Sequence, residues 1–200
     1  MLKRFLATLV LGLVAVTAQA NENYTLLAKP GQLEKPGMIE VREFFWYGCG
    51  HCYNLEPHVK TWLKSKPADV NFVRTPAALN PVWEQNARGY YTAEMMGVLE
   101  PSHDALFQAI HVSKQKLFDQ ASLSRFYAGF GADPKKFDGL FNSFAVSGKV
   151  GLGKNLAKQY GLEGVPALVV NGKYLVKGSD ARAMATVNEL IAKERAAQKK

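Results

Sequence analysis

Two cysteines separated by two residues, in the segment Cys49-Gly50-His51-Cys52, are the residues of this chain best suited to thiol chemistry. The chain has no other cysteine, so a framework of several structural disulfides is excluded. At this spacing both sulfurs lie in the first turn of one helix, where they can form a disulfide and exchange it with other thiols. An apolar, strand-like run precedes the pair and a helix-like run follows it, as a thioredoxin-like redox motif requires. The pattern predicts a protein that moves two electrons by thiol–disulfide exchange.

The two cysteines are expected to have different roles. Cys49 comes at the start of the predicted helix, where free backbone N–H groups and the helix dipole favour a thiolate, so it is the predicted nucleophile. His51 can add a positive or hydrogen-bonding partner to that thiolate. Cys52 lies one turn further in and is the predicted resolving thiol.

A structural disulfide or half of a zinc site would also contain two cysteines at this spacing. A structural zinc site needs four ligands, and the sequence has no second pair of this kind. The remaining histidines show no matching ligand spacing: His58, His103 and His111. We therefore expect no metal and no bound cofactor, because the cysteine pair itself carries the electrons.

Residues 1–20 have the pattern of a secretory signal peptide. Lys3 and Arg4 supply the positive start, Phe5 to Val16 is the apolar stretch, and Ala18-Gln19-Ala20 is a cleavage site of small residues. The rest of the chain is expected to be exported and soluble. Its composition is that of a globular protein, with 48% hydrophobic and 21% charged residues. The formal net charge is +8, but the lysines are scattered, so nucleic-acid binding is not expected.

The apolar patterns predict a strand, a helix and a second, parallel strand, then a block of helices, and finally a helix, two hairpin strands and a helix. Pro57 is expected to kink the helix that follows Cys49. Ser102 and Asp133 are predicted N-caps in the helical block. The predicted strands are Met38–Tyr47, Val70–Arg74, Pro166–Val170 and Lys173–Val176, the last two joined at Asn171-Gly172. The predicted helices after the second strand are Val82–Met96, His103–Val112, Gln120–Phe130, Pro134–Phe144, Val150–Tyr160 and Asp180–Glu194.

This order predicts an α/β protein with a thioredoxin-like fold and an all-helical insertion. Residues 21–80 and 150–200 form the discontinuous thioredoxin-like domain, and residues 81–149 form the insertion. The chain resembles the DsbA family of periplasmic thiol–disulfide oxidoreductases. The resemblance rests on the run Glu43–Cys52, on Glu56, on the loop Gly164-Val165-Pro166 and on the helical insertion.

The resemblance implies a periplasmic dithiol oxidase that donates its disulfide to unfolded exported proteins with free thiols. It also implies reoxidation by a DsbB-like membrane quinone reductase. The segment from Asn21 to Gly37 is too short for the dimerisation domain that periplasmic isomerases carry, so a monomer is expected. The resemblance further implies a cis peptide between Val165 and Pro166, beside the disulfide, where the backbone could pair with a substrate. Without the family, a trans proline at the start of a strand is the default.

Gly50-His51 departs from the Pro-His pair that is more common in the family, and it is the dipeptide of eukaryotic protein disulfide isomerases. The dipeptide between the cysteines influences how far the thiolate is stabilised, and hence the redox poise. A disulfide isomerase or reductase is therefore one alternative function. A non-catalytic binding or assembly factor with this fold is another.

Glu43 shares a strand face with Ile39, Val41 and Phe45, so its carboxyl is expected to point inward beneath the cysteines. A buried acid must be partnered or protonated. It could relay the proton of Cys52, or it could form a buried ion pair that only stabilises the fold, and Arg74 is the candidate partner in either case. In the insertion, Met95, Met96, Phe107 and Phe130 are mostly expected in the core, with one or two lining an apolar groove for unfolded substrate.

Overall fold

The computed structural model of the protein describes residues 22–198. The predicted signal peptide, residues 1–20, lies outside this range. Among the described residues, no helix is both long enough and apolar enough to cross a membrane.

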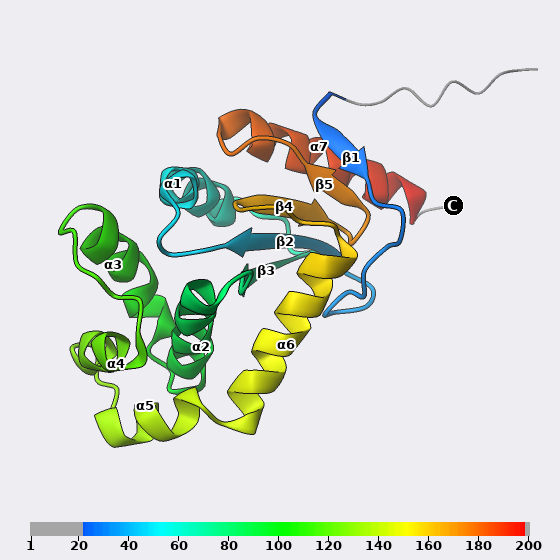
Figure 1. The fold of residues 1–200 in the computed structure, drawn as a ribbon. Coiled ribbons are helices and arrows are strands. Elements are labelled where there is room, and N and C mark those ends of the chain that lie inside the picture. The colour runs from blue at the N-terminus through cyan, green and yellow to red at the C-terminus, as the bar shows by residue number, and fades with distance from the viewer. Residues whose placement is uncertain (1–21, 199–200) are drawn as a thin grey trace, which may run out of the picture.

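A five-stranded sheet with the order β1-β5-β4-β2-β3 forms the centre of the fold (Figure 1). The strands β2 and β3 are parallel, which confirms the predicted β-α-β unit, and the other neighbours are antiparallel. The turn between β4 and β5 has positive φ at both Asn171 and Gly172, as a tight hairpin of this sequence requires. The strands are β1 Tyr24–Leu26, β2 Ile39–Phe45, β3 Val70–Pro76, β4 Ala167–Val170 and β5 Tyr174–Val176.

The edge strand β1 is absent from the sequence-based assignment. It has three residues, too few for an alternating pattern to be recognised, and it becomes a strand by pairing with β5. Its backbone hydrogen-bond partners lie in β5, which belongs to the C-terminal hairpin.

Helices cover both faces of the sheet (Figure 1). On one face, α1 (Gly50–Lys64) and α7 (Ala181–Ala197) pack over Ile39, Val41 and Leu168. On the other face, α6 (Phe144–Gln159) packs over Phe44 and neighbouring residues of β4. Pro57 lies inside α1, which continues past it.

The remaining helices gather at one end of the sheet and enclose a core of their own (Figure 1). They are α2 Pro81–Met95, α3 Leu99–His111, α4 Gln120–Ala128 and α5 Pro134–Phe141. This core also contains Phe45 from the end of β2, Tyr47 from the following turn and Cys52 from α1. The cysteine pair therefore sits where the helical block meets the sheet. The division into two domains at residues 81 and 149 stays a prediction.

Two predicted helix starts are wrong. Ser102 is not an N-cap, because α3 already begins at Leu99, and the Ser102 hydroxyl donates to the Val98 carbonyl at 2.6 Å. Pro101 is accepted there because the first turn of a helix needs no backbone N–H from it. The helix predicted from Val150 begins at Phe144, because the Ser143 hydroxyl caps it and separates it from α5. Asp133 is an N-cap, as predicted.

Candidate active site

The sulfur of Cys49 is the N-cap of α1. Cys49 has extended backbone angles, and its Sγ accepts a hydrogen bond from the backbone N–H of Cys52 at 3.4 Å. The first turn of α1 contains no acidic residue that would repel a negative sulfur. A side-chain atom in the N-cap position faces free N–H groups and the positive end of the helix dipole, both of which stabilise an anion.

These contacts lower the pKa of the Cys49 thiol to about 6. A hydrogen bond from the Cys52 thiol contributes most, and it outweighs the opposing effect of partial burial. The backbone N–H groups of Cys52 and His51 and the charge of His51 lower the pKa further. At neutral pH, Cys49 is therefore largely a thiolate, the reactive form of cysteine.

Cys52 has the opposite character. It is completely buried, and the structure contains both cysteines as free thiols. Burial, the hydrogen bond to Cys49 and the negative charge of the Cys49 thiolate all raise the pKa of Cys52. One thiol is thus accessible and acidic, and the other is buried and holds its proton.

The two residues between the cysteines are both exposed. A Cβ added at Gly50 would have no atom within 4 Å, so packing does not require glycine at this position. Gly48, just before the motif, differs, since a Cβ there would lie 2.3 Å from the ring of Trp46. That ring stacks on Trp83 at 4.8 Å and donates to Asn86 at 2.8 Å, so it has no freedom to move aside.

The loop before β4 lies directly beside Cys49. The peptide between Val165 and Pro166 is cis, as the family resemblance implied. The Cys49 sulfur lies 3.3 Å from the carbonyl oxygen of Val165, to which it donates when it is protonated, across more than a hundred residues of chain. Both loop residues are partly exposed.

Beneath the cysteines, two glutamates share one arginine. Arg74 Nη2 donates to Glu56 Oε2 at 3.0 Å, whereas Arg74 Nε lies 3.4 Å from Glu43 Oε2 without hydrogen-bond geometry. Glu43 is fully buried, as its strand position predicted, and Arg74 is the predicted partner. Burial and the charge of Glu56, opposed by Arg74, raise the pKa of Glu43 to about 8. Burial would also raise the pKa of Glu56, but the hydrogen bond from His103 and the charge of Arg74 outweigh it and lower that pKa.

Two histidines of α3 contact the turn that leads to Cys49, and the sequence reasoning did not assign them. His103 Nδ1 lies 2.7 Å from the Tyr47 hydroxyl, and His111 Nε2 lies 2.7 Å from the Tyr47 carbonyl oxygen. The His111 ring also stacks on Tyr53, next to Cys52, at 4.8 Å. The two histidines are eight residues apart, with buried Phe107 midway, so all three lie on one face of the helix. This spacing on an apolar face was the sequence signal that could have placed the histidines against the core.

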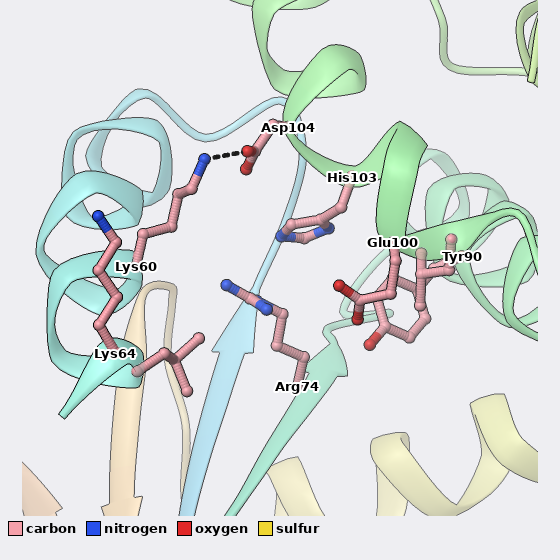
Figure 2. A pocket seen from close by; sticks show the side chains of 9 residues that line it. Lys60, Lys64, Arg74, Tyr90, Glu100, His103 and Asp104 are labelled. Carbon is pink, nitrogen blue, oxygen red and sulfur yellow. Dashed lines mark hydrogen bonds and ion pairs between the residues drawn. The ribbon is translucent and has the colours of Figure 1, made fainter. Parts of the chain in front are cut away.

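Two neighbouring hollows lie between α1 and α3. A groove of about 660 Å³ includes Tyr53 and Phe107 in its wall, and a pocket of about 220 Å³ reaches Arg74 and His103. Figure 2 shows this pocket, with Lys60 and Lys64 extending from α1 on one side and the guanidinium of Arg74 beside the His103 ring.

Of the four insertion residues considered for a substrate groove, only Phe107 lines one of these hollows, and it is 2% exposed. Met96 and Phe130 pack against the insertion core, and Met95 is exposed. Within residues 22–198, no group of three or more histidine, cysteine or acidic side chains could hold a metal ion.

Comparison with known proteins assigns the chain to a family. Residues 69–192 match the model of the DSBA-like thioredoxin domain. The thiol:disulfide interchange protein DsbA of Pseudomonas aeruginosa is 43% identical over 185 residues, which cover 90% of this chain and 88% of that protein. The DsbA of Pseudomonas syringae pv. tomato is 39% identical over 203 residues, covering 96% and 95%.

The chain belongs to the DsbA family. It is a thiol–disulfide oxidoreductase with a thioredoxin-like fold and a helical insertion. The crystal structure of Pseudomonas aeruginosa DsbA superimposes with a TM-score of 0.83 at 43% identity, over 89% of this chain and 95% of that one. The DsbA of Xylella fastidiosa superimposes with a TM-score of 0.82 at 32% identity, over 87% and 96%. The alternative of a non-catalytic factor has no support from these relatives.

Cys49 is expected to be the thiol that reacts first with iodoacetamide in the reduced, folded enzyme. Its reaction rate should follow the thiolate fraction, falling about tenfold for each pH unit below the pKa of about 6 and levelling off above it. Mass spectrometry of the labelled protein between pH 4 and 8 measures this. Unfolded protein in denaturant is the control, since both thiols should then react equally. Labelling of Cys52 before Cys49 in the folded protein would reverse the assignment.

Replacing Gly50 with proline is expected to stabilise the reduced enzyme by about 0.4–1 kcal/mol, because proline restricts the unfolded chain. Proline is favoured at the first helical position, and Cys49, with φ −85° and ψ 117°, already has the conformation required before it. The N–H groups that stabilise the Cys49 thiolate come from His51 and Cys52, so none of them is lost.

Denaturant unfolding of reduced Gly50→Pro against wild type measures the gain. The matched control is Gly48→Ala, which should destabilise by about 1–3 kcal/mol, since its Cβ would overlap the held ring of Trp46. A destabilised Gly50→Pro variant would contradict the steric freedom at position 50.

Proposed function

We propose that this DsbA-family enzyme is a dithiol oxidase of the periplasm that donates the Cys49–Cys52 disulfide to newly exported, unfolded proteins. One observation carries the proposal: the reduced pair consists of an accessible thiolate that caps a helix and a buried thiol that holds its proton. A stabilised thiolate makes Cys49 a good leaving group and favours the reduced enzyme, and both effects drive the disulfide out to the substrate.

The reaction takes place in two exchanges. A substrate thiolate attacks Sγ of Cys49, a new substrate–Cys49 disulfide forms, and the Cys49–Cys52 bond breaks with its electron pair on Cys52. A second substrate thiolate then attacks the substrate sulfur of the mixed disulfide, and Cys49 leaves as a thiolate. The substrate is oxidised by two electrons, and the enzyme's disulfide is reduced. His51 assists the departure of the Cys49 sulfur through its backbone N–H and, when its ring is protonated, through positive charge.

Glu43 is the proposed source of the proton for Cys52. The first exchange leaves a buried thiolate at Cys52, and burial disfavours that charge. The raised pKa of Glu43 keeps its carboxyl protonated at neutral pH, so it can pass a proton to Cys52 and remain as a carboxylate beside Arg74.

Val165 and Pro166 are the proposed substrate-binding residues. The carbonyl of Val165 faces the Cys49 sulfur, and both Val165 and Pro166 are partly exposed. An extended substrate segment that pairs with this backbone would bring its cysteine next to Cys49. Such pairing uses main-chain groups, which suits an enzyme that acts on many unfolded sequences.

The cell-level part of the proposal follows from family membership and from residues 1–20, whose pattern is that of an export signal. The enzyme works as a monomer and is reoxidised by a DsbB-like membrane quinone reductase. No bound cofactor takes part, because the electrons leave through the same pair of cysteines.

Cys49→Ser is expected to abolish oxidation of a reduced, unfolded peptide with two cysteines, since no other nucleophilic sulfur reaches the surface of the motif. Cys52→Ser should instead accumulate mixed disulfides through Cys49, because the resolving thiol is missing. Fluorescence or chromatography of the peptide and mass spectrometry of the adducts measure both outcomes. Mixed disulfides on Cys52 in the Cys49→Ser variant would contradict the assigned roles.

Disulfide isomerisation is the second candidate function, and Gly50-His51 is the observation that favours it. As a monomeric oxidase, the enzyme should oxidise reduced ribonuclease rapidly and reactivate scrambled ribonuclease slowly. Recovery of ribonuclease activity from the two starting materials measures this, and Gly50→Pro is the matched variant for the dipeptide. Equal rates from both starting materials would favour the isomerase.

Acidification is expected to lower the melting temperature of the reduced enzyme relative to the oxidised one. The disulfide restrains the unfolded chain by about 2 kcal/mol for a four-residue loop. In the reduced enzyme, a Cys49 pKa of about 6 adds at most about 1.4 kcal/mol at pH 7, before screening by solvent. This gain grows as pH rises towards the ordinary thiol pKa and is lost as pH falls through 6.

Calorimetry of the reduced and oxidised enzyme between pH 5 and 8 measures the difference between their melting temperatures. Ionisations common to both forms cancel in this difference. Near pH 7 the two melting temperatures should be close, and at pH 5 the oxidised enzyme should melt higher. Reduced Cys49→Ala is the control and should lack the thiolate component. A constant difference across this range would contradict a pKa of about 6.

A further inference from the structure

His103 connects the turn before Cys49 with the buried glutamates. It lies on α3 and is 7% exposed, with Nδ1 2.7 Å from the Tyr47 hydroxyl and Nε2 3.2 Å from Glu56 Oε1. The pKa of Glu56 is lowered, so its carboxyl is ionised and can only accept hydrogen bonds, and Nε2 then carries the hydrogen and donates it to Glu56. Nδ1 then accepts from the Tyr47 hydroxyl. The contacts are satisfied together by one neutral tautomer of His103 and an ionised Glu56.

Glu43 and Glu56 compete for a single positive charge. Among residues 22–198, Arg74 is the one lysine or arginine within ion-pair distance of either carboxyl. Two buried carboxylates beside one guanidinium would leave an uncompensated negative charge, which is costly at low dielectric. One carboxyl of the pair therefore keeps a proton at neutral pH.

The hydrogen bonds around the pair are strongly unequal. Glu56 receives one from Arg74 at 3.0 Å and one from His103 at 3.2 Å. Neither buried oxygen of Glu43 receives a hydrogen bond from another described residue, and its contact with Arg74 is longer, at 3.4 Å. Glu56 thus receives a hydrogen bond from the N–H of His103, and Glu43 receives no corresponding hydrogen bond.

We propose that His103 is a positioning residue that, by donating to Glu56, keeps the shared proton on Glu43 beneath Cys52. The proposal rests on the function assigned to Glu43 above, and it gives the helical insertion a part in the chemistry of the cysteine pair. Without this hydrogen bond, Glu56 would keep only its contact with Arg74, its advantage as the anion would shrink, and Glu43 would become a carboxylate more readily. Less of the neutral acid that supplies the proton of Cys52 would then be present at neutral pH.

The other charged groups near His103 do not replace this contact. The titratable groups that face it are Tyr47, Glu56, Lys60, Lys64, Arg74, Tyr90, Glu100 and Asp104. Lys60 forms its ion pair with Asp104 at the surface, and Figure 2 shows both at the rim of the pocket. Burial, followed by the charge of Arg74, lowers the pKa of His103, although Glu56 acts in the opposite direction. The lowered pKa keeps the ring neutral at physiological pH.

Two amide variants separate the two ends of the histidine. Glutamine places its amide near Nε2 and can still donate to Glu56, whereas asparagine is shorter and retains only the Tyr47 side. Infrared spectroscopy of the reduced enzyme detects the protonated carboxyl, and Glu43→Gln identifies the band that belongs to Glu43. Wild type and His103→Gln should show this band at pH 7. In His103→Asn its titration midpoint should fall by about one pH unit, a tenfold loss of proton affinity.

An unchanged Glu43 midpoint in folded His103→Asn would overturn the proposal. If that variant fails to fold, nitrogen-15 NMR of the wild-type His103 ring decides the matter, since the proposal requires the neutral Nε2–H tautomer between pH 6 and 8. The Nδ1–H tautomer or a doubly protonated ring would overturn it. These readouts do not involve thiol exchange. If Glu43→Gln keeps full oxidase activity, the proposed proton transfer from Glu43 to Cys52 is wrong. The effect of His103 on the Glu43 midpoint is still measured in that case, because the infrared readout does not depend on activity.

Discussion

The chemistry of the site depends on the hydrogen bonds that Cys52 donates to the Cys49 sulfur, one from its thiol and one from its backbone N–H. The Cys49 side chain, whose sulfur is attacked and later released in the reaction, therefore also caps α1. Capping is normally done by an oxygen, and a sulfur in this position gains most when it is negative. The backbone N–H groups at the start of the helix therefore add to the stabilisation of the thiolate, to which the Cys52 thiol contributes most. The exposed residues between the cysteines can only adjust that stabilisation.

Burial divides the two thiols into different chemical species. Cys49 faces the open loop at Val165, while Cys52 is enclosed by the core that the insertion shares with Phe45 and Tyr47. The helical insertion is therefore part of the redox site, because it supplies the low-dielectric surroundings in which Cys52 keeps its proton. The same surroundings force Glu43 and Glu56 to share one proton over Arg74.

Much of this arrangement could be predicted from local pattern. The cysteine pair, the strand before it and the helix after it follow one another in the sequence, so their relation is set by short-range geometry. The inward direction of Glu43 follows from strand alternation, and the hairpin from Asn171-Gly172. The predictions failed where a boundary depended on a single hydroxyl or proline, as at Ser143 and Pro101, or where a strand had only its partner to define it, as in β1.

The sequence by itself determined the reaction class, since two cysteines in the first turn of a helix have few other uses, and it determined the order of strands and helices that places them. Only the tertiary structure decided what surrounds them. The contacts of His103 with Tyr47 and Glu56, and of Cys49 with Val165, join segments 47 to 116 residues apart. Such contacts carry no local pattern, because they depend on how α3 packs against α1 and how the loop before β4 returns to the sheet. Protonation states in a buried cluster depend on those distances, so the sequence could name the charged residues but not say which of them keeps the proton.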